Sequence, residues 1–122
     1  MHSDVMMRDG SPGCTSVTNL DVHDLARLSR TFGLHACFLV TPVVSQQQHA
    51  TRIIDHWTAG HGAEYNPDRK EAISTVRISE SLAKVKQDLC EDYDNSPMLI
   101  GTAARIITNK VIDYGDVCDR ML

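Results

Sequence analysis

Three basic side chains share one face of a predicted helix, and their spacing suits phosphate binding. His23, Arg27 and Arg30 lie at positions i, i+4 and i+7, so a helix would direct them to the same side. An arginine guanidinium can hold a phosphate through parallel hydrogen bonds. Asn19 precedes them at a strand-to-helix turn, where α/β proteins gather ligands. By spacing alone, a solvated helix face is the simpler interpretation.

A second basic segment, Asn66-Pro67-Asp68-Arg69-Lys70, adds two cations. Together with Arg27 and Arg30 it could form a local RNA-binding patch. The chain has 12 Lys and Arg against 16 Asp and Glu, with a formal net charge of -4, so no domain-wide positive field attracts nucleic acid. Any RNA contact must therefore be local. The same cations could instead pair with the chain's carboxylates.

Other site motifs give little support for different chemistry. The sequence has no glycine-rich dinucleotide or phosphate loop, no Gly-x-Ser-x-Gly and no His-Glu-x-x-His, which argues against common nucleotide-binding and hydrolase classes. His49 and His56 are seven residues apart, about 10.5 Å along a helix, which is too far to bind one metal ion side by side. The four cysteines are single, which indicates reduced thiols. No metal site is predicted.

Apolar periodicity and chain breakers predict the elements that position these residues. A helix begins at a cap on Asp21 and runs through Phe32, with Gly33 as its left-handed stop. The apolar run within 35–41 predicts a buried strand that Pro42 ends. The N-terminal segments 5–7 and 15–18 could form a hairpin or an irregular extended lead-in. The other predictions are a helix from a cap at Ser45 to Gly60, a loop over 60–70, strands over 73–78 and 98–103, and helices capped by Ser79 and Asp113.

Strand and helix alternate three times, which predicts an α/β fold with a mostly parallel sheet and helices on both faces. The 122 residues suit a single domain, 1–122. A final helix normally returns the chain to another strand, so we expect this domain to be incomplete. No apolar run approaches the roughly 20 residues of a membrane span, and no secretory signal opens the chain, so we expect a cytoplasmic protein.

Four strings, in this order, resemble a known family. They are Asn-Leu-Asp-Val-His-Asp at 19–24, Phe-Leu-Val-Thr-Pro at 38–42, His-Trp-Thr-Ala-Gly-His-Gly-Ala at 56–63 and Tyr-Asn-Pro-Asp-Arg-Lys at 65–70. They are similar to the SPOUT-class SAM-dependent RNA methyltransferases, in particular a small bacterial branch sometimes joined to tRNA guanine-N1 methyltransferase. The resemblance implies S-adenosyl-L-methionine as cofactor, RNA and in particular tRNA as substrate, a homodimer, and a C-terminal trefoil knot beyond Leu122.

The resemblance also implies roles for individual residues. The family's first motif has the form Asn-x-Gly-x-x-x-Arg-Thr-Ala-x-x-Phe-Gly, and aligning its arginine with Arg27 puts Gly33 on the last glycine. Asp21 and His23 then stand where the motif has Asn and Gly. A truncated module that only binds or dimerises is the alternative function. The implied site residues are Arg27 and Asn19 for catalysis, His23, Arg27, Arg30, Asn66, Arg69 and Lys70 for RNA, and Gly101, Thr102 and Ala103 for the cofactor.

Overall fold

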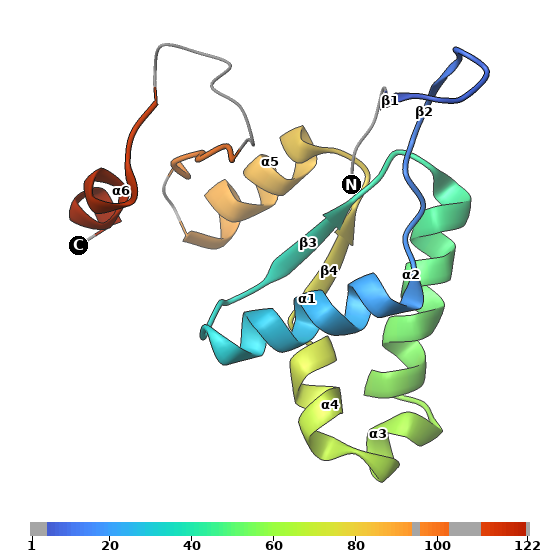
Figure 1. Ribbon diagram of the computed structural model, residues 1–122. Helices are drawn as coiled ribbons and strands as arrows, with labels where there is room; N and C mark the ends of the chain where they lie inside the picture. The colour runs from blue at the N-terminus through green and yellow to red at the C-terminus, as the bar shows by residue number, and fades with distance from the viewer. Residues whose placement is uncertain (1–4, 94–95, 103–110, 122) are drawn as a thin grey trace.

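A parallel pair of strands lies at the centre of the structure, a computed structural model that describes residues 5–93, 96–102 and 111–121. Strands β3 (Cys37–Val40) and β4 (Val76–Ser79) pair with Leu39 opposite Ile78 (Figure 1). The α/β class is confirmed, but the sheet is smaller than predicted, because only these two strands pair in parallel in the described part of the chain. The connection from β3 to β4 contains helices α2 (Val44–Thr58), α3 (His61–Tyr65) and α4 (Pro67–Ile73).

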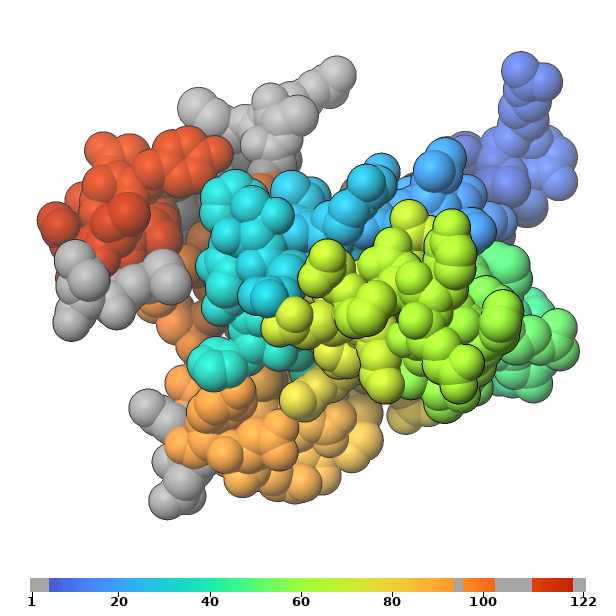
Figure 2. Space-filling model, turned by 90° about the horizontal axis from the view of Figure 1, so that it is seen from below, coloured from blue at the N-terminus to red at the C-terminus, as the bar shows by residue number. Residues whose placement is uncertain are grey.

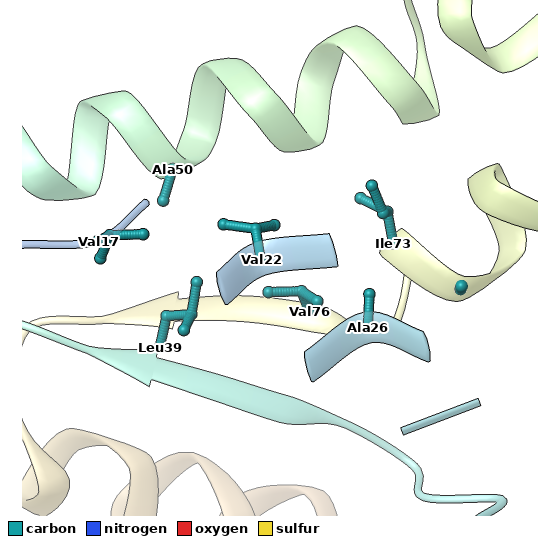
Figure 3. Close-up of a cluster of buried hydrophobic side chains, with 8 residues drawn as sticks. Val17, Val22, Ala26, Leu39, Ala50, Ile73 and Val76 are labelled. Carbon is teal, nitrogen blue, oxygen red and sulfur yellow. The ribbon is translucent and has the colours of Figure 1, made fainter. Parts of the chain in front are cut away.

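Helices cover both faces of this small sheet. Leu39 and Val76 point into a core beneath α2 and α1 (Asn19–Thr31), as Figure 3 shows. On the opposite face, the Arg77 guanidinium carbon lies 5.7 Å from the centre of the Phe38 ring, and its Nη1 is 3.4 Å from the Asp92 carboxylate of α5 (Leu82–Tyr93). The alternation of side chains along each strand separates these two layers.

The core joins α1, α2 and α4 to the strands. Val22 of α1 and Ile73 of α4 are fully buried, and Ala26 and Ala50 are equally inaccessible. Alanines at these contacts let the helix backbones approach closely, while the branched side chains fill the remaining space. The cluster consists of Val17, Val22, Ala26, Leu39, Ala50, Ala72, Ile73 and Val76.

The cap of helix α1 lies three residues earlier than predicted. Its N-cap is Thr18, whose Oγ1 accepts a hydrogen bond from the Asp21 N–H at 3.2 Å, while Asp21 Oδ2 accepts from the Thr18 N–H at 2.8 Å. Asp21 is therefore the reciprocal partner in a capping box and not the cap itself. The predicted stop at Gly33 is confirmed, since Gly33 adopts a φ of +64°. Phe32 follows the helix and is exposed.

Helix α2 has the predicted apolar face but not the predicted cap. Ala50 is buried, and Ile53, Ile54 and Trp57 pack against the core cluster. The N-cap position is Val43, which provides no side-chain hydrogen bond, so Ser45 lies inside the first turn. The Thr41 N–H donates to the Ser79 carbonyl at 3.0 Å, directly after β3. Only three residues then separate β3 from α2, so the helix begins at Val44, before Ser45.

The predicted loop over 60–70 is wrong, because this segment forms α3 and α4. Asn66 caps α4 by accepting a hydrogen bond from the Arg69 N–H at 2.9 Å, and Pro67 occupies the first turn. Proline at this position costs no hydrogen bond, so the pair is a strong helix start. Ile73 consequently ends a helix, and the strand predicted over 73–78 begins only at Val76.

The N-terminal hairpin is present with a different second strand. Strand β1 (Val5–Met6) pairs antiparallel with β2 (Pro12–Gly13) around a turn that contains Gly10 at a φ of +80°. The Met7 N–H donates to the Ser11 carbonyl at 2.9 Å, which closes the turn before residues 15–18 can pair. That second segment instead leads into α1.

Two of the C-terminal predictions are wrong and one is confirmed. Ser81, not Ser79, accepts a hydrogen bond from the Lys84 N–H at 3.1 Å at the start of α5. Residues 98–102 form no strand: Met98, Leu99 and Ile100 are exposed and pair with none of the strands that the structure describes, while Ala103 lies outside the described residues. Asp113 caps α6 (Tyr114–Met121), as predicted, through the Asp116 N–H at 2.9 Å. No helix in the described ranges is long and apolar enough to span a membrane.

The capping box gives a direct test of this account of α1. Thr18→Ala removes the side-chain acceptor of the Asp21 N–H, and we expect it to lower the free energy of unfolding by about 1 kcal/mol in urea titrations. Ser45→Ala is the matched control, because Ser45 is exposed and makes no cap; its effect should stay within about 0.5 kcal/mol. Equal losses in the two variants would contradict the assignment of Thr18 as the cap.

Candidate nucleic-acid interface

Helices α1 and α4 pack side by side, so the two basic segments of the sequence meet on one surface. The Nη2 of Arg30 on α1 lies 2.7 Å from Oε2 of Glu71 on α4, and both side chains remain more than half exposed. Figure 2 looks onto this side, where α1 in blue to cyan adjoins α3 and α4 in yellow-green. We call this surface, formed by α1, α4 and the end of α2, the α1–α4 face.

The arginines of α1 are already paired with carboxylates. Arg27 Nη2 lies 2.7 Å from Asp24 Oδ1, with side chains 70% and 60% exposed, and Arg30 is held by Glu71. The alternative that these cations pair with carboxylates is therefore confirmed for both. Exposed pairs of this kind contribute about 0–1 kcal/mol, so a phosphate group can replace the carboxylate at little cost.

Asn19, Asn66 and Lys70 occupy distinct positions around this face. Asn19 is exposed in the first turn of α1, one turn before His23. The side-chain oxygen of Asn66 caps α4 by accepting a hydrogen bond from the Arg69 N–H, which fixes the first turn of the helix. Lys70 is exposed next to Arg69 on α4. The predicted RNA-binding residues thus lie on two adjacent helices, α1 and α4, and Asn66 has a structural role as the cap of α4.

Trp57 is the centre of a cluster that the sequence did not reveal as a site. The Arg69 guanidinium carbon lies 4.5 Å from the centre of the Trp57 ring. The rings of His23 and His56 meet Trp57 edge-on, with centroids 5.5 Å and 5.1 Å away. We call these four residues the Trp57 cluster. The sequence placed Trp57 only on the apolar face of its helix. The one sequence signal for a site was that the single tryptophan of the chain stands shortly before the basic segment 66–70.

Gly62 permits the close packing around Trp57. A β-carbon at this position would lie 2.7 Å from Trp57 Cε3 and 3.0 Å from the backbone oxygen of His56. Real β-carbons do not approach other heavy atoms so closely, and the backbone oxygen cannot move aside. Only glycine at position 62 therefore allows α3 to pack this closely against the indole.

The surroundings of His23 in the Trp57 cluster disfavour its protonated form. Partial burial lowers the pKa of His23, the positive charges of Arg69 and Arg27 lower it further, and Asp24 acts weakly in the opposite direction. The neutral imidazole is therefore favoured near pH 7. A neutral ring can pack on Trp57 without adding a third positive charge beside the two arginines.

The segment predicted to hold the cofactor forms no cradle. Gly101 and Thr102 are exposed and belong to no helix or strand, and a β-carbon added to Gly101 would have no neighbour within 4 Å. An adenosyl group needs a concave, largely enclosed site, which these two residues do not provide. Ala103, the third predicted contact, lies outside the described residues. The residues therefore do not fit S-adenosyl-L-methionine as they stand.

An open polar depression lies at the carboxyl end of β4, away from the Trp57 cluster. It has a volume of about 320 Å³ and contains the ion pair of Lys84 and Asp88, whose Nζ and Oδ1 are 2.7 Å apart. The hydrogen bond and charge of Asp88 raise the pKa of Lys84. Lys84 and Asp88 neutralise each other, so Glu80 leaves the lining with a net negative charge, which does not suit a phosphate. Its lining residues are Gln47, Ile78, Ser79, Glu80, Lys84 and Asp88.

The histidines do not assemble a metal site in the part of the chain that the structure describes. No three His, Cys, Asp or Glu side chains there are grouped so that they could hold a metal ion. His56 instead contacts Trp57.

The sequence itself resolves the class of protein. It matches the family described as SAM-dependent RNA methyltransferase over residues 1–121. The chain belongs to this family. The predicted resemblance to RNA methyltransferases is confirmed, and the basic α1–α4 face lies within the matched range.

Relatives of this methyltransferase family member differ in length from it. Proteins of Nitratidesulfovibrio vulgaris and Oleidesulfovibrio alaskensis, both named tRNA (guanine-N(1)-)-methyltransferase, are 33% and 34% identical over 105 residues, which is 86% of this chain and 25% of each relative. A protein of Aquifex aeolicus, named only "uncharacterized protein", is 33% identical over 111 residues, 91% of this chain and 54% of the relative. The chain thus spans a quarter to about half the length of these relatives.

The lowered pKa of His23 predicts a pH dependence of stability. The unfolded chain binds a proton at the usual value near 6.5, whereas the folded chain binds it only at lower pH. Protonation therefore favours unfolding, so the free energy of unfolding should fall as the pH drops below about 6.5 and level off once the pH is below the folded-state pKa. His23→Gln should flatten this part of the profile in urea titrations.

An NMR titration of the His23 ring measures the same shift directly. The account requires a midpoint below the usual 6.5. A midpoint at or above that value would contradict the packing described for His23 against Trp57, Arg69 and Arg27.

Proposed function

We propose that this chain is the RNA-facing part of an enzyme that methylates RNA with S-adenosyl-L-methionine. Membership in the family supports the reaction class. The single observation that carries the RNA-facing role is the α1–α4 face, where adjacent helices carry Arg27 and Arg30 on one and Arg69 and Lys70 on the other, with Arg69 over the Trp57 ring. In a chain with a net charge of -4, such a local patch is the expected form of an RNA contact.

The proposed binding mode exchanges protein carboxylates for RNA phosphates. Arg27 and Arg30 are held in extended, exposed positions by Asp24 and Glu71, and their guanidinium groups can pass to a phosphate without a large change of position. Phosphate contacts fix the orientation of the RNA and carry no sequence information by themselves. Recognition of the acceptor nucleotide must therefore come from other groups on the face.

Bound S-adenosyl-L-methionine would supply an electrophilic methyl group to a base or ribose atom of the RNA. The described residues near Gly101 and Thr102 do not enclose it. Our proposal gives Arg27 and Asn19 the task of positioning the RNA for the reaction, since both are exposed on α1. The cofactor contacts of Gly101, Thr102 and Ala103 are proposed on the family resemblance alone.

The proposed substrate is tRNA, because two relatives carry the name of a tRNA methyltransferase. A homodimer is proposed as well, supported by exposed apolar side chains where α1 ends: Leu28, Phe32 and Leu34 are 51%, 72% and 53% exposed. The setting proposed is the cytoplasm, as expected for an enzyme that modifies RNA. We propose residues 1–122 as a single domain of the SPOUT class.

A binding or dimerisation module without activity of its own is the second candidate. The exposure of Gly101 and Thr102, with no neighbour to form a cradle, favours it. Calorimetric titration of S-adenosyl-L-methionine into the folded chain separates the two functions. Saturable binding near one cofactor per chain supports the enzyme, and absence of heat from a folded chain supports the module.

Charge reversal on the α1–α4 face tests the RNA-facing role. We expect Lys70→Glu to weaken binding of a tRNA by about fivefold in fluorescence anisotropy and to reduce the salt slope by about one unit or more, because it removes a phosphate contact. Lys86→Glu is the matched control: Lys86 is exposed on α5, which covers the other face of the sheet, and its affinity should change less than about twofold. Equal losses from both variants would show that the binding reports net charge and not this face.

A further inference from the structure

Arg69 is the cation that the fold controls most closely on the α1–α4 face. Its backbone N–H is fixed by the Asn66 cap at 2.9 Å, so the start of α4 is tightly defined. Its guanidinium carbon lies 4.5 Å from the centre of the Trp57 ring, and the residue is exposed. Unlike Arg27 and Arg30, Arg69 forms no ion pair with any carboxylate that the structure describes.

The contact with Trp57 orients a planar, permanently charged group. Cation–π attraction to an indole holds the guanidinium in place, and the edges of the His23 and His56 rings flank the indole in turn. Gly62 lets α3 pack close to the indole, since a β-carbon there would lie 2.7 Å from Trp57 Cε3. Arg69 is therefore pre-organised before any ligand arrives, which lowers the entropy cost of binding.

A pre-organised guanidinium over an aromatic ring suits a nucleobase better than a bare phosphate. Bases of single-stranded RNA stack on aromatic rings and on arginine planes. In a duplex the faces of the bases are covered by their neighbours, and proteins then rely on phosphate and ribose contacts. Phosphate contacts alone would not need the tryptophan, because a guanidinium or an ammonium group binds a phosphate without an aromatic ring beneath it.

We propose that Arg69, oriented by Trp57, receives the base of an unpaired nucleotide, while the neighbouring Lys70 contacts the adjoining phosphate. The inference deepens the proposed function and rests on it: the RNA acceptor is an unpaired segment, such as a loop, and not a continuous helix. His23, neutral near pH 7, adds no further charge to the place where the base stacks.

The test replaces Arg69 by lysine, which keeps the positive charge but lacks the planar guanidinium group. Arg69→Lys should weaken binding of single-stranded oligouridine by about tenfold, because stacking on arginine is lost, and change binding of a hairpin duplex of equal length less than about twofold. Arg52→Lys, at an exposed arginine of α2 outside the Trp57 cluster, is the matched control and should change neither.

Tryptophan fluorescence provides an independent readout at the site. Trp57 is the only tryptophan of the chain, so a saturable change in its emission reports a ligand at the Trp57 cluster. Oligouridine should produce this change in the wild type and in Arg52→Lys, and Arg69→Lys should lose most of it. Circular dichroism on each variant verifies that the fold is intact.

The outcomes separate this inference from the proposed function. If Arg69→Lys binds both RNAs as the wild type does, loses both equally, or retains the full emission change, the stacking role of Arg69 is overturned while the RNA-facing role stands. A wild type that prefers the duplex overturns it as well. If the wild type binds neither RNA at low salt, the proposed function itself fails and this inference fails with it.

Discussion

The packing of α1 against α4 is the constraint on which the rest of the structure depends. Val22 and Ile73 are fully buried between these helices, α2 and the strands, and Ala26 and Ala72 keep the backbones close. Each branched side chain stabilises the fold by about 1.5–3 kcal/mol when it is withdrawn from water. Because the helices are fixed at this contact, Arg30 reaches Glu71 and Trp57 lies between His23 and Arg69.

Long elements with a clear period could be predicted from the sequence, and short ones could not. The apolar faces of α1 and α2 extend over several turns, so their 3.6-residue period could be detected in the sequence. Helices α3 and α4 have only five and seven residues, too few to display a period, although Asn66-Pro67 is itself a helix-start signal. The apolar run from Met98 was mistaken for a strand because periodicity does not reveal whether a neighbouring strand is present.

The candidate site was predicted in its charges but not in its centre. Helical spacing grouped His23, Arg27 and Arg30, and composition singled out Asn66–Lys70, yet only the tertiary packing joins the two segments. Trp57 was not predicted as a site residue because a tryptophan on an apolar helix face is most often a core residue. Its ring is in fact partly buried against the core cluster. The exposed edge of such an amphipathic side chain becomes visible only when Arg69 is found over its ring.

Mapping of RNA cross-links tests the central claim, that the α1–α4 face contacts RNA, most directly. A photoreactive tRNA would be cross-linked to the wild-type chain and the modified peptides identified by mass spectrometry. The account predicts cross-links within 19–31 of α1 and within 57–70, which includes Trp57 and Arg69. Cross-links confined to α5 over 82–93, with none on α1 or α4, would contradict it.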